Sequence, residues 1–239
     1  VVGLQYLNYE GGKFSKTHKR GIFCGSLPSS NINPDILRAY LTFVIPETGD
    51  TEFKWSEFES RINSDLIGNF GNFINRILTF AYNKLDGNIT KPKTLTKEDK
   101  IFQNEINDKI SKIDSLLEKL ELRHAFHEIL LLSDLGNKYF NDQEPWIVLK
   151  ENKKRAEDII YLCVNLCKSL AIVSYPYMPS TSERIFKFLN LKNIAWDFSK
   201  EIKKINKPEI LFSKLEPDFL NEFKKLTSKA TNLKDLFKN

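Results

Sequence analysis

Apolar residues recur at helical intervals through most of the chain, and the longest regular stretch opens at Ser56. Its apolar positions follow one another at steps of four and three residues, which predicts one helix with a continuous buried face. Asp86-Gly87 is expected to end this helix, because glycine accepts the left-handed conformation of a C-terminal cap. The apolar positions are Phe58, Ile62, Leu66, Phe70, Phe73, Ile77 and Ala81.

The same spacing predicts a succession of further helices. Asn33 and Pro34 supply the N-cap and the first position of one helix, which the stretch 46–51 ends. Thr96 and Asp99 form a capping box ahead of the next. Other helices are expected over about 102–120, 123–141 and 156–173, and Ser180 with Glu183 predicts a second capping box before Ile185, Phe188 and Leu189.

The two ends of the chain carry weaker patterns. Alternating residues over 1–10 predict a strand or hairpin arm, and the Gly, Ser, Pro and Asn residues of 21–33 predict a loop. Residues 210–239 predict a short extended piece and then a Lys-rich amphipathic helix. The sum is a mainly α protein, an antiparallel helix bundle preceded by a small loop-rich segment.

The long predicted helix is unusually rich in asparagine. Asparagine forms helices poorly, because its side-chain amide competes for backbone hydrogen bonds. Several in one helix lower its local propensity, and a functional face is one explanation for that cost. They are Asn63, Asn69, Asn72, Asn75 and Asn83.

Composition narrows the classes of function. The 36 Lys and Arg against 31 Asp and Glu permit a nucleic-acid partner without requiring one. The longest apolar run, 158–173, is too short to cross a bilayer, so no membrane partner is expected. The three cysteines lack zinc-site spacing, and His124 and His127 lack a third ligand, so no metal site is expected. Without a visible signal peptide, a cytoplasmic location is expected.

One candidate site is the stretch Gly11–Thr17, which reads Gly-Gly-Lys-Phe-Ser-Lys-Thr. Glycine tolerates positive φ angles and the close approach of a ligand. Lysine is a compact charge with three donors, which suits phosphate oxygens. The stretch lacks the spacing of a P-loop. It therefore fits either a loop that embraces a polyphosphate or a solvated turn with ordinary surface lysines.

A second candidate lies on the long helix and near Trp146. Asn72 and Arg76 are four residues apart, hence neighbours on one helix face. Their side chains match the edges of nucleic-acid bases, and Arg76 can also stack on a base. Trp146, held by Pro145, is either a core residue or a platform for an unstacked base.

The first stretch resembles the Lys-Met-Ser-Lys-Ser loop of class I aminoacyl-tRNA synthetases, with Phe14 in place of Met and Thr17 in place of the last Ser. In that family the loop clamps the phosphates of ATP. The resemblance implies that Lys13 and Lys16 hold phosphate oxygens and that Ser15 supports the loop. The chain departs from the family at 18–21, His-Lys-Arg-Gly, where the family more often runs straight into Arg-Gly.

The rest of the chain is similar to the anticodon-binding bundle of methionyl-tRNA synthetases. Residues 65–76 with 85–87 resemble its first long helix, and 53–58 resemble the entry to the bundle. Residues 139–146, Tyr-Phe-Asn-Asp-Gln-Glu-Pro-Trp, resemble its Tyr-Ile-Asp-x-x-x-Pro-Trp segment, and 175–179 resemble its Pro-x-x-Pro terminator. The likeness runs in order from Gly11 to about Leu191.

This resemblance implies a methionine–tRNA ligase, which forms methionyl-adenylate and pyrophosphate from methionine and ATP and then transfers the methionyl group to the 3′ end of tRNA. Asn72, Arg76 and Trp146 would read the CAU anticodon of tRNA-Met, with Trp146 stacked on its first base and Pro145 fixing the approach. ATP with Mg²⁺ would serve the full enzyme.

The resemblance also implies a division of the chain. Residues 1–55 would end the catalytic region in a small α/β stem-contact segment with the signature loop, 56–195 would form the anticodon-binding domain, and 196–239 would pack on the bundle. The nucleotide-binding sheet with its His-Ile-Gly-His-type motif is not in this chain, which opens with Val1 and has Met178 as its only methionine. We expect a piece of a longer protein, inactive by itself.

Three other functions remain open. The chain could be a non-catalytic RNA-binding helical module whose Gly-Lys loop meets RNA phosphates. It could be a plain helical scaffold with Trp146 packed inside. Within the enzyme class, it could belong to a synthetase for leucine, isoleucine, valine or cysteine.

Overall fold

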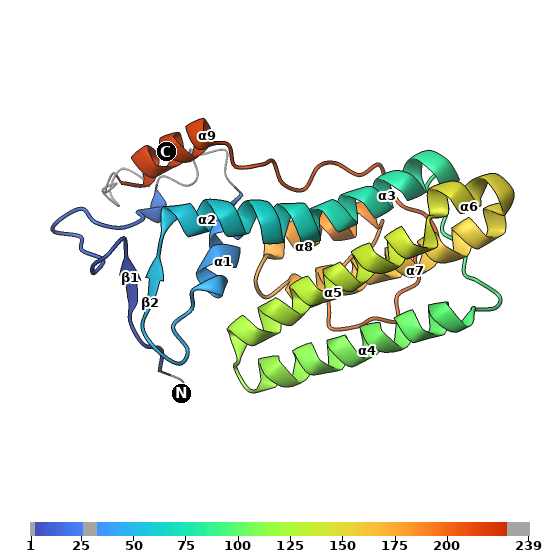
Figure 1. The fold of residues 1–239 in the computed structure, drawn as a ribbon, viewed down its shortest axis with the longest axis horizontal. Helices are drawn as coiled ribbons and strands as arrows, with labels where there is room; N and C mark the ends of the chain where they lie inside the picture. The colour runs from blue at the N-terminus through green and yellow to red at the C-terminus, as the bar shows by residue number, and fades with distance from the viewer. Residues whose placement is uncertain (1–2, 26–32, 229–239) are drawn as a thin grey trace.

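The computed structural model describes residues 3–25 and 33–228, and it is mainly helical, as the apolar spacing predicts (Figure 1). The parts of the expected strand, loop and tail helix that fall on 1–2, 26–32 and 229–239 lie outside the described residues. In chain order the elements are β1 Leu7–Tyr9, α1 Pro34–Phe43, β2 Thr51–Phe53, α2 Trp55–Arg61, η2 Ile62–Gly71, α3 Asn72–Leu85, α4 Lys97–Glu118, α5 Leu122–Gln143, α6 Pro145–Glu151, α7 Lys153–Ser174, α8 Pro179–Phe188 and α9 Pro217–Thr227.

The long predicted helix is one rod of α2, η2 and α3, but its middle is wound as a π-helix (Figure 1). Phe58, Ile62, Leu66 and Phe70 follow at steps of four, and all are fully buried. In an α-helix each such step turns the apolar face by about 40°, whereas the wider turn of a π-helix keeps the four side chains nearer one side. The rod ends at Asp86, which is left-handed with φ 54°.

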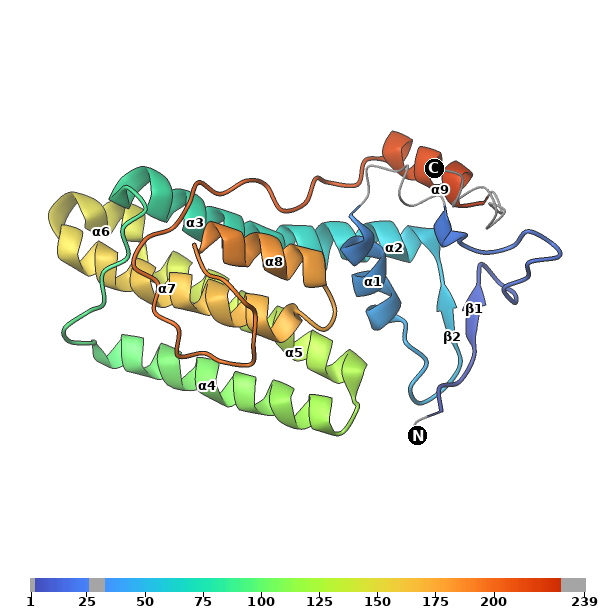
Figure 2. The same ribbon diagram turned by 180° about the vertical axis from the view of Figure 1, so that it is seen from behind.

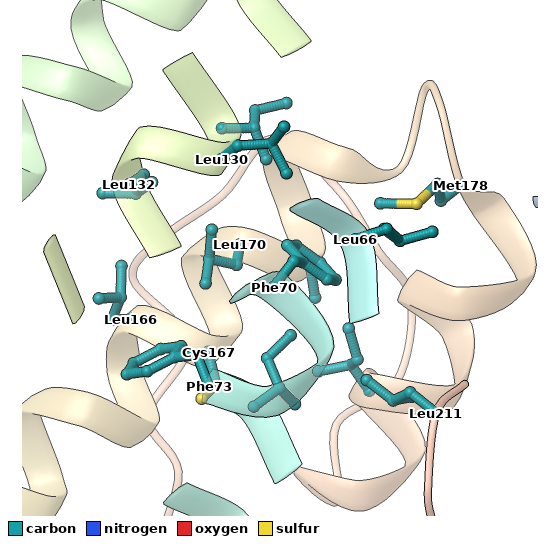
Figure 3. Packing of buried hydrophobic residues seen from close by; sticks show 14 of the residues in the cluster. Leu66, Phe70, Phe73, Leu130, Leu132, Leu166, Cys167, Leu170, Met178 and Leu211 are labelled. Carbon is teal, nitrogen blue, oxygen red and sulfur yellow. The ribbon is translucent and has the colours of Figure 1, made fainter. Parts of the chain in front are cut away.

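The bundle is built on α7, whose buried side chains run along nearly its whole length. The hairpin of α4 and α5 packs on one side of α7, and α3 and α8 complete the bundle (Figures 1 and 2). Figure 3 shows Phe73 of α3 beside Leu166 and Cys167 of α7 in this core. Cys163 and Cys167 are buried free thiols in this core.

The strand predicted over 1–10 forms, but it does not make a hairpin. β1 pairs in parallel with β2, with Leu7 opposite Thr51 and Tyr9 opposite Phe53. β2 falls within a stretch whose sequence predicted only the end of a helix and the entry to the next. The parallel pair places the chain that follows Tyr9 at one edge of the molecule (Figure 1).

Two of the predicted helix starts are confirmed and one is wrong. The Asn33 side chain accepts from the Asp35 amide at α1, and Thr96 and Asp99 make their capping box at α4. The capping box at Ser180 is absent, because α8 begins earlier, at Pro179. The buried carboxylate of Asp35 accepts from the Thr181 amide at 2.6 Å and from the Ser180 hydroxyl at 2.7 Å. A carboxylate of α1 therefore caps α8 across the fold.

Beyond α8 the chain first loops over the bundle, and it then runs along the bundle in extended form to α9, which lies beside α2 (Figure 2). We call residues 206–216 the strap. The Asn63 amide donates to the Leu215 carbonyl and accepts from its N–H, both at 2.9 Å. Phe212 lies against Gly71, where an added Cβ would stand 3.0 Å from its ring. The strap is thus fastened to the π-helical segment at both ends of η2.

Among the described residues, no helix is long and apolar enough to cross a membrane.

Candidate functional sites

Arg76 is held on the outside of α3 by three residues of α5. Its Nη2 donates to the Asn141 side chain at 2.8 Å, and its Nη1 donates more weakly to Asn137 at 3.5 Å. Its guanidinium lies over the ring of Phe140, 4.9 Å from the centroid. These contacts orient the guanidinium while its partners remain neutral, so its positive charge is not compensated by them.

Trp146 stands at the start of α6, on the corner that follows α5. Glu144 turns the chain with φ 41°, and the buried Pro145 occupies the first position of α6, where its missing N–H costs nothing. The indole is 40% exposed, and its ring meets Phe140 at 5.4 Å between centroids. Trp146 is therefore not a core residue: one part of its indole packs on Phe140 and the rest is exposed to solvent.

Phe140 brings two of the predicted site residues together. It is 3% exposed, and Arg76 and Trp146 both contact its ring. The third predicted residue, Asn72, is exposed one turn before Arg76 and lines a small cleft with Asn75 and the strap. The structure thus places a guanidinium and an indole against one shared ring at one end of the bundle, with an amide one turn before the guanidinium.

The sequence interpretation missed the residues of α5 that support this site. Asn137 and Asn141 are four apart, a spacing that puts both on one helix face, and Phe140 lies beside them; this spacing could have identified the face that Arg76 contacts. Asn69 proved structural, because its amide donates to the Leu130 carbonyl at 3.1 Å and its oxygen accepts from Ser133 at 2.9 Å.

A buried ion pair lies behind the corner. Asp99 of α4 is fully buried and receives both guanidinium nitrogens of Arg155, at 2.6 and 2.9 Å. Burial opposes the charge of Asp99, but the hydrogen bonds from Arg155, Tyr139 and the Thr96 amide outweigh it and hold the pKa of Asp99 below its usual value. Burial and then Asp99 raise the pKa of Tyr139, which therefore stays a donor.

The other candidate, Gly11–Thr17, forms a closed turn beyond β1. Ser15 and Arg20 exchange two backbone hydrogen bonds at 2.8 Å, and the Ser15 hydroxyl accepts from the His18 amide at 3.2 Å. Lys16, Thr17, His18 and Lys19 make the exposed tip between them. His18 and Lys19, which stand where the family more often runs straight into Arg-Gly, therefore lie at the tip of this turn.

Phe14 packs the turn down while the two lysines face solvent. Its ring lies 5.2 Å from that of Tyr9, and Gly21 has φ 142° directly against it, where a Cβ would come within 2.6 Å of the ring. Lys13 and Lys16 are exposed, and in the part of the chain that is described neither has a carboxylate partner. Both ammonium groups can therefore meet an anion.

The base of the turn is tied to β2 and α2. The Gly11 amide donates to the Glu52 carboxylate, which lowers the pKa of Glu52. The Trp55 indole donates to the Tyr9 hydroxyl at 2.8 Å, and the Trp55 amide donates to Glu10 at 2.7 Å. Figure 1 shows that this turn and α6 lie at opposite ends of the molecule.

No group of three or more metal-ligating side chains occurs in 3–25 or 33–228. His124 contacts Glu121 at 3.1 Å on the surface of α5.

Two family models match the chain. The model for the anticodon binding domain of methionyl tRNA ligase matches residues 89–231, and the model for class I tRNA synthetases (M) matches residues 1–78. Together they account for nearly the whole sequence.

Similar proteins carry the same family name. Methionine–tRNA ligase of Nanoarchaeum equitans is 35% identical over 95% of this chain and 28% of its own length. That of Borrelia turicatae is 38% identical over 98% of this chain and 32% of its own length. The cytoplasmic methionine–tRNA ligase of Caenorhabditis elegans is 37% identical over 94% of this chain and 25% of its own length. The chain spans about a third or less of these relatives.

Solved structures agree on the fold. Mycobacterium tuberculosis methionyl-tRNA synthetase in complex with methionyl-adenylate matches 87% of this chain and 42% of its own, with a TM-score of 0.78 at 22% identity. The apo form of that synthetase matches 77% of this chain and 39% of its own, with a TM-score of 0.72 at 21% identity. With a family model that covers more than half of its residues, the chain belongs to the methionyl-tRNA synthetase family.

Proposed function

We propose that the protein to which this chain belongs is a methionine–tRNA ligase, and that the bundle described here binds the CAU anticodon of tRNA-Met. The observation that carries the proposal is the meeting of Arg76 and Trp146 on Phe140 at an exposed end of the bundle. Sequence-specific recognition of RNA targets splayed loop bases, which stack on aromatic rings and bond to side chains through their edges.

Each of the predicted residues has a part in this proposal. Trp146 offers its open face to the first anticodon base. Arg76, already oriented by Asn141, can reach a base edge or a phosphate, and Asn72 offers a donor and an acceptor one turn away. Pro145 fixes the start of α6 and so the angle of the indole.

The turn at the other end would serve the first step of the reaction. Lys13 and Lys16 would hold phosphate oxygens of ATP, bound as its Mg²⁺ complex, and stabilise the charge that develops as pyrophosphate leaves. Ser15 closes the turn, Phe14 holds it against Tyr9, and Thr17 stands at its tip. No covalent chemistry is required of these residues. The methionyl-adenylate would then react with the 3′ end of the tRNA.

The division of the chain follows this proposal. Residues 1–55 would belong with the catalytic region, 56–195 would be the anticodon-binding domain, and 196–239 would be an extension on the bundle. On this proposal the protein would work in the cytoplasm. The chain by itself is expected neither to activate methionine nor to charge tRNA.

The anticodon proposal is tested by filter binding of this chain to tRNA carrying CAU and to the same tRNA with an altered anticodon. We expect clear preference for CAU and weaker binding at higher salt, because phosphate contacts release counterions. Equal binding of both tRNAs would favour the alternative function, a non-specific RNA-binding module. Absence of binding would leave a helical scaffold.

The phosphate proposal is tested in the full-length protein by ATP–pyrophosphate exchange. Lys16→Ala should reduce exchange strongly, whereas Lys19→Ala, an exposed lysine of the same turn, is the matched control and should change it little. Equal effects of the two substitutions would mean that only the general charge of the turn matters.

A further inference from the structure

The last turn of α5 forms hydrogen bonds to the buried ion pair of Asp99 and Arg155. Arg155, near the start of α7, donates to Asp99 through both nitrogens, and the same Nη2 donates to the Gln143 side chain at 2.5 Å. The Tyr139 hydroxyl donates to Asp99 at 2.5 Å. Tyr139 and Gln143 are four residues apart, so the ion pair grips one face of a single helical turn at two points.

The opposite face of this turn is the one that supports the proposed anticodon site. Phe140 and Asn141 contact Arg76, and Phe140 contacts Trp146. Gln143 is the final residue of α5, and only the left-handed Glu144 and Pro145 separate it from Trp146. The turn 139–143 therefore lies between the ion pair and the two side chains that would meet RNA.

We propose that Asp99, Arg155 and Gln143 are positioning residues for anticodon recognition, which fix the corner between α5 and α6 so that Trp146 and Arg76 are presented in their binding geometry before RNA arrives. This inference rests on the proposed function. Its physical basis is that ordering side chains on binding costs affinity, and a site that is ordered beforehand avoids this cost.

A buried ion pair is a poor device for stability alone, because the cost of removing two charges from water offsets their attraction. It does impose direction, because a guanidinium fork donates to a carboxylate and to an amide oxygen only at fixed angles. Here three helices, α4, α5 and α7, are oriented by one fork. The contact to Gln143 is the part of this network that reaches the corner.

Gln143 offers a selective test, because it can be changed while the ion pair stays intact. Gln143→Met keeps the length of the side chain and removes the acceptor, whereas Gln143→Glu keeps an acceptor oxygen and is the matched control. The full-length protein is used for tRNA binding. The indole N–H resonance of Trp146, assigned by Trp146→Phe, reports the corner directly.

We expect Gln143→Met to reduce the preference for CAU over an altered anticodon by about three- to tenfold, the effect of one side chain that must be ordered on binding. Its Trp146 resonance should shift or broaden, while Gln143→Glu should keep both the preference and the resonance. Tyr139→Phe, which removes only the hydroxyl that contacts Asp99, should change the preference in the same direction and provides a second variant should Gln143→Met fold poorly.

Two results overturn different statements. A wild-type protein without preference for CAU removes the proposed function and this inference together. The positioning role alone is overturned if the wild-type protein prefers CAU and the Gln143→Met and Tyr139→Phe variants keep both this preference and the Trp146 resonance unchanged.

Discussion

The guanidinium of Arg76 lies 4.9 Å from the ring centroid of Phe140, although the two residues are far apart in the chain and belong to different helices. The ring is also the surface on which Trp146 rests. Phe140 is nearly buried, so it cannot itself be a base platform. Its part is to contact both a cation and an indole and so to fix the position of each.

Replacing Phe140 by leucine tests whether Phe140 supports Arg76 without itself contacting RNA. Phe140→Leu removes the face under Arg76, and we expect binding of CAU-bearing tRNA to weaken by about 0.5–1 kcal/mol, the usual worth of a partly exposed cation–π contact. A double-mutant cycle with Arg76→Lys measures the coupling. Coupling near zero would mean that the two residues act independently. The control is tRNA with an altered anticodon, whose binding should change less.

The indole itself should matter more. Trp146→Ala should weaken binding of CAU-bearing tRNA by about 1–3 kcal/mol, the range for loss of one stacked base. Trp196 is the matched control, because its 44% exposure is close to the 40% of Trp146 and it lies in the segment after α8. Filter binding of both variants is the measurement. Equal losses for Trp146→Ala and Trp196→Ala would contradict the assignment.

Acid should remove the benefit of the Asp99 carboxylate. The folded pKa of Asp99 is lowered, so the stability it provides is full above the unfolded pKa of about 3.9 and is lost as pH falls through the lower folded value. At pH 7, Asp99→Asn leaves Arg155 without its carboxylate and should cost about 3 kcal/mol.

Urea unfolding of wild type and Asp99→Asn between pH 7 and pH 3 checks this expectation. The difference between the two proteins should hold down to about pH 4 and narrow below it. Glu128, whose pKa Lys112 and Lys109 lower against the effect of burial, titrates in both proteins and cancels in the difference. A difference that stays constant to pH 3 would contradict the assignment.

Gly136 should be a strict position for helix packing. A Cβ there would lie 2.5 Å from the Phe73 ring and 2.6 Å from Leu166, both in the core. Gly136→Ala should therefore destabilise the fold by about 1–3 kcal/mol through overpacking, in spite of alanine's better helix propensity. Gly49→Ala is the control, since nothing lies within 4 Å of a Cβ at that position. Chemical denaturation gives both values.

The sequence was sufficient to predict where the main helices lie, but not β2 or the group that caps α8. Apolar spacing predicts α3, α4 and α5 because each buries one face, and it predicts α7 because apolar residues fill most of that helix, whose second half is buried on all sides. It could not predict β2, since three residues carry little pattern. The capping box at Ser180 failed because Asp35, from a distant helix, supplies the cap instead. A local signal cannot foresee a partner that only tertiary contact provides.

The proposed anticodon site shows the same limit. Spacing placed Asn72 and Arg76 on one helix face and left Trp146 as either a core residue or a base platform, and the resemblance then joined the three in one site. That Arg76 and Trp146 meet on Phe140 depends on how α3 packs against α5, which no single segment encodes. The asparagines of the long helix divide likewise: Asn63 and Asn69 bind neighbouring backbone, whereas Asn72 is left exposed.

The hydrogen bonds between Asn63 and Leu215 connect the C-terminal part of the chain to the long rod and, through it, to α3. A chain cut after Lys207 would lose both the partner of Asn63 and the ring against Gly71. The wide winding of 62–71 would then lose its tertiary support and, we expect, tighten into ordinary α-helix. Rewinding the ten residues of η2 with the tighter turn of an α-helix would rotate α3 about the axis of the rod and turn Arg76 away from the Phe140 ring. We therefore expect removal of the tail to weaken the proposed recognition of RNA.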